Sequence, residues 1–300
     1  MSKSSSSIEQ LDFGPELIEG DIVLDKTMAF ALANFKESTS VRRKRDVSDQ
    51  TVNIWKDGVI AYVISDEMSG IGRRIIRKAF RKIAHRTCVR FIPKQNEHKD
   101  YVKFISKCKG CYSSVGRKGG EQVLCLGEGC LNRPRALHEI MHALGFFHEH
   151  SRLDRDNHVK ILWWNIQDGM ERNFLTYRHS PTDSLKEPYD FLSIMHYDNK
   201  AFSSNGMDTI QSKRNPKMRF GKVRKLSKVD LRQLKKLYRC PVRMIRYKGS
   251  CRNLYWKCNS YATRSDMCET SYVFMKFYCP RACAFCCKYI TLKLTKEKFF

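Results

Sequence analysis

Apolar residues recur along residues 46–241 at the spacings typical of helices and strands. Residues 71–85 place apolar side chains three or four positions apart, which predicts an amphipathic helix. Runs rich in β-branched and aromatic residues predict strands at 59–65, 87–92, 101–106 and 121–126. Two more helices are expected, one at 131–144 and one at 227–238, the second with a serine cap and an acid three residues later. The pattern indicates a mixed α and β half followed by a half rich in loops.

The sequence on either side of this body differs in composition. Residues 1–41 are acidic and poor in aromatic residues, and residues 42–45 are four consecutive basic residues, RRKR. Residues 251–287 contain seven cysteines in a stretch too short to bury much apolar surface, so we expect disulfides there. The predicted organisation is therefore an appended segment at 1–45, a main domain at 46–241, a small cysteine-rich module at 251–287 and a basic tail at 288–300.

The cysteine content and the charge restrict the environment and the partners. Thirteen cysteines in 300 residues are typical of an oxidising compartment, and the odd number leaves at least one thiol unpaired. We therefore expect an extracellular protein whose signal peptide is missing from this sequence, because the first seven residues are polar and no apolar segment follows them. No stretch approaches the roughly 20 apolar residues that span a membrane. The alternative, a cytosolic protein, is opposed by the cysteines.

The net charge of +25 favours anionic partners such as acidic proteins, glycosaminoglycans or anionic membranes. A solvated, soluble surface explains the same charge equally well. Nucleic-acid binding is not expected, because no recognised binding motif accompanies the basic residues.

The clearest chemical signal is HEIMHALGFFH, which runs from His138 to His148. Histidines four residues apart on a helix share a face, so His138 and His142 can bind one metal ion. Glu139 lies beside them, placed to act on a water molecule. Gly145 can adopt a positive φ that ends the helix and returns the chain, which makes His148 a third ligand. Three imidazoles and one open position are typical of a catalytic zinc site. The alternative is a helix whose histidines only pack in the core.

The resemblance to a known family rests on these residues and on three further stretches. Residues 138–156 read HEIMHALGFFHEHSRLDRD, which is similar to the extended signature of astacin-type zinc endopeptidases. Residues 193–197 (SIMHY) resemble the Met-turn of that family, and residues 111–130 also resemble it. The likeness covers 46–241 and implies an α+β, two-lobed zincin fold of the metzincin type, with a mixed sheet, an active-site helix and one Zn²⁺ per subunit.

The resemblance also implies roles for individual residues. Glu139 would be the general base and acid, and Tyr197 a fifth zinc ligand that later donates to the oxyanion. Met195 would form an apolar floor beneath the zinc. Glu149 would contact the new N-terminus after processing, and the spacing from Trp55 places that terminus at Asp46.

Latency and substrate binding follow from the same likeness. Asp21, in the segment LIEGD, would occupy the position of the water on zinc until an activating protease cuts after Arg45, although Ile18 replaces the aromatic residue usual in this motif. Protein or peptide substrates, acidic or from the extracellular matrix, would bind as an extended strand along 121–126. Lys213 would favour an acidic side chain in the pocket beyond the scissile bond, and a solvated loop is the alternative.

The cysteines are paired by resemblance. The main domain would contain the disulfides Cys88–Cys240 and Cys111–Cys130, and a Cys108–Cys125 bridge is expected because these two extra cysteines lie close by. A structural zinc site formed by these four neighbouring cysteines is the alternative. The CPRACAFC tail resembles a ShKT module of nematode-like proteins, which implies the pairs Cys251–Cys286, Cys258–Cys279 and Cys268–Cys283 and leaves Cys287 over.

Taken together, the sequence predicts a secreted zinc metalloendopeptidase (EC 3.4.24.-) made as a zymogen. The alternative is a catalytically silent secreted binding protein that acts through its ShKT module.

Overall fold

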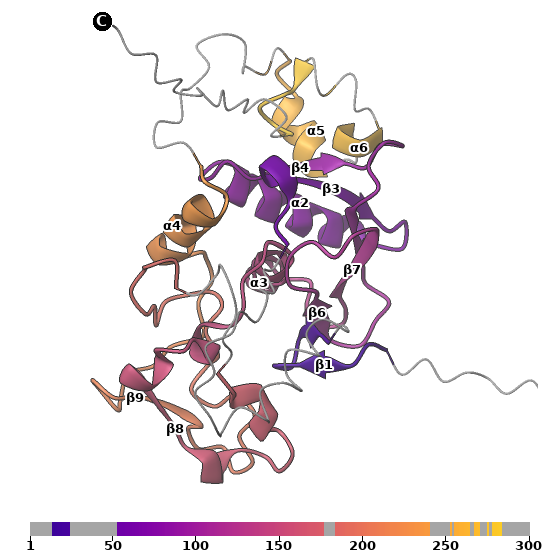
Figure 1. Cartoon of the computed structure of the whole chain (residues 1–300). Helices are drawn as coiled ribbons and strands as arrows, with labels where there is room; N and C mark the ends of the chain where they lie inside the picture. The colour runs from indigo at the N-terminus through magenta and orange to yellow at the C-terminus, as the bar shows by residue number, and fades with distance from the viewer. Residues whose placement is uncertain are drawn as a thin grey trace, which may run out of the picture.

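The computed structural model describes residues 14–24, 53–176 and 184–240, and in the C-terminal region residues 253, 255–264, 267–270, 275 and 278–283. Figure 1 shows two lobes, with helix α3 between them. In the described residues, no helix has both the length and the apolar character required to cross a bilayer.

A seven-stranded mixed sheet forms the first lobe, in the order β1-β2-β6-β7-β5-β3-β4. The central pairs β3–β4, β3–β5 and β5–β7 are parallel, whereas β6 runs antiparallel to β7. Strands β1 and β2 form a hairpin from the N-terminal segment, and β2 pairs with β6. The strand bounds are β1 Leu17–Ile18, β2 Ile22–Val23, β3 Val59–Ile64, β4 Arg90–Pro93, β5 Tyr101–Ile105, β6 Cys111–Ser113 and β7 Glu121–Leu126.

Two helices pack with this sheet and contact each other, α2 (Gly70–Ala84) and α3 (Arg133–Ala143). Helix α2 begins where the side chain of Ser69 accepts a hydrogen bond from the backbone N–H of Gly72, and its apolar face is buried. Phe80 on that face stacks on Phe91 of β4 at 4.1 Å between ring centroids. Helix α3 is buried over most of its length, so its polar side chains need partners inside the protein.

The second lobe contains little regular structure. Strands β8 (Val159–Ile161) and β9 (Ile210–Ser212) form an antiparallel pair, and short 3₁₀ helices at Glu149–Ser151, Arg155–Asn157, Trp163–Asn165 and Glu171–Phe174 surround a small apolar core. A further 3₁₀ turn, Lys56–Gly58, precedes β3. Helix α4 (Lys228–Leu237) closes the domain and has the expected capping box between Ser227 and Asp230.

The described part of the C-terminal region contains α5 (Cys258–Arg264) and α6 (Met267–Thr270), and α5 contacts α2. Figure 1 shows both helices at the end of the molecule where α2 and β4 lie. The disulfides Cys258–Cys279 and Cys268–Cys283 cross-link this region as expected. The Cys251–Cys286 pair and Cys287 lie outside the described residues.

Most of the expected elements are confirmed, with differences at their ends. The strand expected at 87–92 begins only at Arg90, because Thr87 still belongs to the turn after α2, where its hydroxyl donates to the carbonyl of Ile83. The sequence did not predict β1, β2 or β6, which are two or three residues long and too short to show a periodic pattern.

Candidate metal centre

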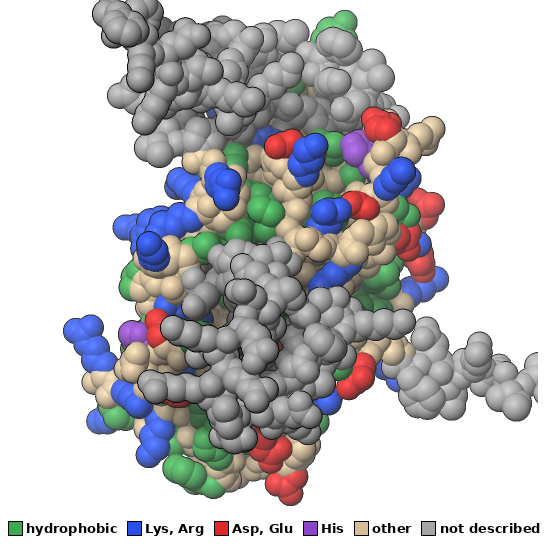
Figure 2. Space-filling view, viewed as in Figure 1, with side chains coloured by type: hydrophobic (Ala, Val, Ile, Leu, Met, Phe, Trp, Pro, Cys, Tyr) green, Lys and Arg blue, Asp and Glu red, His purple; other side chains and the backbone are tan. Residues whose placement is uncertain are grey.

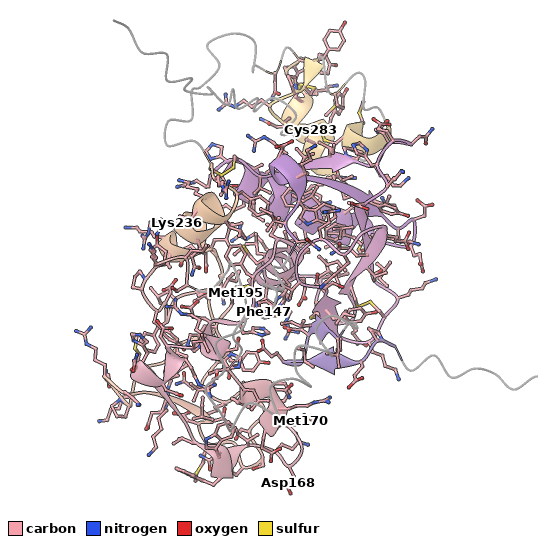
Figure 3. All side chains as sticks on the ribbon, in the orientation of Figure 1. Phe147, Asp168, Met170, Met195, Lys236 and Cys283 are labelled. Carbon is pink, nitrogen blue, oxygen red and sulfur yellow. A yellow bond between two sulfur atoms is a disulfide. The ribbon has the colours of Figure 1, made fainter. Side chains whose placement is uncertain are left out.

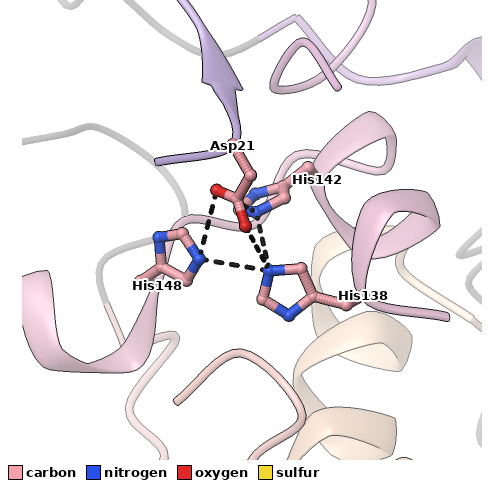
Figure 4. A group of neighbouring side chains, drawn as sticks. All are labelled: Asp21, His138, His142 and His148. Atoms are coloured by element: carbon pink, nitrogen blue, oxygen red, sulfur yellow. Dashed lines mark hydrogen bonds and ion pairs between the residues drawn. The ribbon is translucent and has the colours of Figure 1, made fainter. Parts of the chain in front are cut away.

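Three histidines from α3 and the following turn point at one position. His138 and His142 lie one helical turn apart on α3. The helix ends at Leu144, and Gly145 (φ +107) reverses the chain so that His148 faces the helix. The Nε2 atom of His138 lies 3.1 Å from the Nε2 atoms of both His142 and His148. Figure 4 shows the three rings converging.

The hydrogen bonds of the Nδ1 atoms show which nitrogen of each ring is free to bind a metal ion. Nδ1 of His138 lies 2.8 Å from the carbonyl oxygen of Ile194, and Nδ1 of His142 lies 2.7 Å from that of Phe146. A carbonyl only accepts, so the proton is on Nδ1 and the lone pair of each Nε2 points into the site. Burial lowers the pKa of His142 to about 4, which keeps its ring neutral. Converging imidazole nitrogens are the donor set of a zinc ion, and the residues fit it.

A carboxylate of the N-terminal segment completes this group. Asp21 is the last residue of the β1–β2 turn, with Oδ2 3.0 Å from Nε2 of His138 and Oδ1 3.4 Å from Nε2 of both His142 and His148. Asp21 and the three histidines form the candidate metal-binding group of the described residues (Figure 4). Oδ1 of Asp21 is buried and has no hydrogen-bond partner among the described residues, which fits an oxygen placed to bind a cation.

The turn that carries Asp21 depends on glycine. Gly20 has φ +77, and a Cβ atom there would lie 2.7 Å from the ring of Phe202. Glycine is therefore required both for the backbone conformation and for the close packing of this turn.

Glu139 follows His138 on α3 and faces the same cleft. It is 2 % exposed, and its Oε2 has no hydrogen-bond partner among the described residues. Burial raises the pKa of Glu139 well above its usual range, and the charge of Asp21 raises it further. A carboxyl group with such a pKa can both accept and return a proton near neutral pH.

Glu19 has a role at the site that the sequence did not predict. Its carboxylate is buried, and Oε2 lies 2.5 Å from Nδ1 of His148. The N-terminal segment therefore contributes two acids to the site. Asp21 faces the Nε2 atoms of the histidines, and Glu19 contacts Nδ1 of His148 on the other side of its ring. The only signal in the sequence was an acid next to a Gly-Asp turn.

Tyr197 lies beside the histidines, and its hydroxyl donates to the backbone carbonyl of Glu19. Its ring stacks on that of His150 at 3.8 Å. In this arrangement the hydroxyl is held by the N-terminal segment. The role as a fifth metal ligand expected from sequence stays a prediction for the form without that segment.

The turn that contains Met195 is anchored from α4. Met195 is 3 % exposed and lies in the main apolar core, and Figure 3 shows it between the lobes. Buried Asp230 of α4 accepts hydrogen bonds from the Ser193 hydroxyl (2.7 Å) and the Ile194 N–H (3.1 Å). Because the Ile194 carbonyl in turn accepts from His138, Asp230 helps to hold that ring in place.

Glu149 is buried immediately after the third histidine. Its Oε1 accepts from Arg152 Nη1 and from the Asp190 N–H, both at 2.8 Å. Burial raises the pKa of Glu149 to about 7. Asp46, its expected partner after processing, lies outside the described residues, as does Arg45.

A cleft of about 450 Å³ opens next to the histidines. Glu139, His138, Tyr197 and Arg135 line it, together with the Glu19–Asp21 turn. Lys213 does not. It is exposed after β9, and its backbone N–H donates to the carbonyl of His158. The cation that lines the cleft is Arg135, in the first turn of α3, which the sequence analysis did not single out.

The substrate edge expected at 121–126 is wrong. Strand β7 lies between β5 and β6, so neighbouring strands use its hydrogen-bonding groups. The strand on the cleft side is β6, and β2 pairs with it, with the Ser113 N–H donating to the carbonyl of Asp21 at 2.9 Å. The N-terminal segment therefore occupies the edge available to an extended peptide.

The cysteines near the cleft form disulfides. The structure contains Cys88–Cys240, Cys108–Cys125 and Cys111–Cys130, the pairs expected in the main domain. The alternative of a structural zinc site formed by Cys108, Cys111, Cys125 and Cys130 is therefore wrong. Two of the bridges fix β6 and the adjoining loop at the rim of the cleft.

Comparison with protein families agrees with this geometry. Residues 47–239 match the peptidase family described as astacin. The chain is 41 % identical over 234 residues to zinc metalloproteinase nas-15 of Caenorhabditis elegans, which covers 77 % of this chain and 41 % of that protein. It is 37 % identical over 246 residues to nas-7 of the same organism, with 80 % and 63 % covered. The chain thus spans less than two thirds of either relative.

A solved structure shows the same fold. High choriolytic enzyme 1 is a hatching enzyme zinc-protease from Oryzias latipes (medaka fish). It superposes with a TM-score of 0.59 at 38 % sequence identity, over 67 % of this chain and 100 % of that chain. The likeness therefore extends over the whole of that zinc-protease chain.

Proposed function

The chain belongs to the astacin family of zinc metalloproteinases, and from that premise we propose that it is a secreted, zinc-dependent endopeptidase made as a zymogen. The observation that carries this proposal is the convergence of three Nε2 atoms beside buried Glu139. A binding protein without activity would not need an acid with a raised pKa at that position.

The chemistry is divided between zinc and the protein. Zinc bound by His138, His142 and His148 would polarise the scissile carbonyl and make water a stronger nucleophile. Glu139 accepts the proton of the attacking water and delivers it to the leaving amine. Its buried carboxyl group, raised in pKa, is suited to both steps. Tyr197, once released from the Glu19 carbonyl, donates a hydrogen bond to the oxyanion.

A protein or peptide substrate binds as an added strand on β6. The antiparallel pairing of β6 with β7 leaves the other edge of β6 to β2 in this chain, and a substrate takes that edge after the N-terminal segment leaves. Backbone hydrogen bonds supply the affinity, so tolerance of many substrate sequences is expected.

Latency is proposed to come from residues 1–45 as a propeptide. The Asp21 carboxylate lies against the histidine nitrogens that would bind the metal. The Glu19 carboxylate contacts His148, and its backbone carbonyl accepts a hydrogen bond from the Tyr197 hydroxyl. Strand β2 pairs with the edge of β6. An activating protease that cuts after Arg45 would free the peptidase domain, residues 46–241. Its new N-terminus at Asp46 would then meet Glu149.

The test of this function is cleavage of casein by the zinc-loaded, disulfide-bonded chain before and after a cut between residues 45 and 46. We expect cleavage only after the cut. If the cut chain binds one zinc ion and cleaves nothing, the alternative of a silent binding protein acting through a ShKT module at residues 251–287 is favoured.

Arg135 is proposed to select acidic side chains in the cleft, the role that the sequence analysis gave to Lys213. Replacing it by Gln (R135Q) is expected to lower kcat/KM for a peptide with Asp or Glu in the cleft by about tenfold, the worth of one charge-assisted hydrogen bond. The matched neutral peptide should change less than about twofold.

The control is R133Q, which removes an exposed arginine from the same turn of α3 that does not line the cleft. Equal losses for acidic and neutral peptides with R135Q would show that Arg135 supports the fold and not the preference.

A further inference from the structure

Positive charge is concentrated in the segment that leads into and includes α4. Residues 213–239 contain twelve Lys and Arg side chains and a single acid, Asp230. The much longer stretch 53–176 contains 22 Lys and Arg against 13 Asp and Glu. Asp230 is 1 % exposed and accepts hydrogen bonds inside the protein, so it forms no part of the exposed surface.

The twelve cations are exposed, and few of them are paired. Arg219 pairs with Asp208, and Arg232 and Lys236 pair with Glu187. Within the part of the chain that the structure describes, the other nine have no ion pair. We call this set the basic ridge: Lys213, Arg214, Lys217, Lys222, Arg224, Lys225, Lys228, Lys235 and Arg239.

The segment that carries the ridge passes beside the cleft. On α4, Lys228 and Lys235 are seven residues apart, which places them on one face of the helix, and Arg239 lies just beyond its C-terminal end. Before α4, Gly221 and Val223 line the cleft, and Lys222 between them is exposed. Figure 2 shows blue side chains along the side of the molecule where α4 and the β8–β9 region lie in Figure 1.

The surface chemistry selects among anionic partners. Between residues 213 and 239, all of which the structure describes, no large hydrophobic side chain is exposed, so the ridge has nothing to insert into a membrane. Its aromatic residues, Phe220 and Tyr238, are buried, so it has no platform for stacking nucleic-acid bases. A dense group of exposed cations without ion pairs suits a hydrated polymer of high charge density.

We propose that the basic ridge binds a sulfated linear polysaccharide of the glycosaminoglycan type. Such binding places the open end of the cleft against polysaccharide-bearing matrix. It does not depend on the proposed peptidase activity, because no ridge residue lines the cleft.

The test measures heparin binding by the full-length chain across a salt series. The ridge variant carries R224Q, K228Q and K235Q, and the matched control carries R74Q, K78Q and K82Q on the exposed side of α2. The ridge variant should bind heparin at least about tenfold more weakly near 0.15 M salt, with a salt slope smaller by about two, whereas the control should change less than about threefold.

Equal losses in the two variants would overturn the proposal, because total charge would then explain binding. Tighter binding of a DNA duplex than of heparin would also overturn it. If the ridge variant fails to fold, the proposal is tested instead on the parent chain, by comparing lysine acetylation with and without heparin. Heparin should protect Lys228 and Lys235 and leave Lys78 and Lys82 reactive, and the reverse pattern contradicts the ridge.

Discussion

Replacing Glu139 by Gln is expected to lower kcat of the processed enzyme by about 10³ and to leave zinc stoichiometry unchanged. The amide has nearly the same shape, so it fits the buried position that the carboxyl group occupies at 2 % exposure. It has no basic oxygen, so the attacking water keeps its proton and the leaving amine receives none. Peptide cleavage and zinc content measured on the same preparation check this prediction.

The loss of kcat in E139Q must be distinguished from a loss of zinc binding. Glu139 makes no hydrogen bond through Oε2 to the described residues, and the ligand rings are held by Ile194 and Phe146, not by Glu139. Zinc affinity should therefore survive E139Q. A kcat within about tenfold of the parent, with zinc retained, would remove Glu139 from the mechanism.

The Asp21→Asn substitution is expected to give cleavage by the uncut chain, at a rate at least about tenfold above that of the uncut parent. The carboxylate lies 3.0–3.4 Å from three imidazole nitrogens, and neutral Asn cannot match its attraction for the cationic centre. Loss of one charge-assisted hydrogen bond would weaken the binding of the N-terminal segment to the site by roughly 1.5–3 kcal/mol. The fraction of molecules with an open site would then rise tenfold or more. Cleavage of a quenched peptide by chain with an intact Arg45–Asp46 bond checks it.

The control is E16Q, a change of equal charge in the same N-terminal segment. Glu16 forms an exposed ion pair with Arg172 at 3.5 Å, which contributes little. The uncut E16Q chain should stay inactive. If uncut D21N is as inactive as the parent while cut D21N is active, latency comes from β2 and Glu19, and not from Asp21.

The sequence predicted the metal group well because its geometry is local. His138 and His142 lie on one helix, and Gly145 brings His148 back within a few residues, so spacing alone places the three rings. Helices α2 and α4 and strand β7 were predicted for the same reason, since their period and their caps are written into consecutive residues.

What the sequence did not predict depends on contacts between distant segments. Whether a strand lies at the edge of a sheet is decided by its neighbours, so β7 was mistaken for the edge that belongs to β6. Arg135 and Lys213 are both basic and exposed, and only the path of the chain places Arg135 at the cleft. The contact of Glu19 with His148 joins residues 129 positions apart, and no local pattern marks it.

Removal and restoration of zinc tests whether this chain is a zinc-dependent peptidase. The chain cut after Arg45, with its disulfides formed, would be assayed on one quenched peptide after dialysis against a chelator and again after one equivalent of Zn²⁺. We expect cleavage to fall to background when zinc is removed and to return when it is restored. Cleavage that persists in the zinc-free protein, or a zinc-loaded protein that cleaves no peptide, would contradict a zinc peptidase built on His138, His142 and His148.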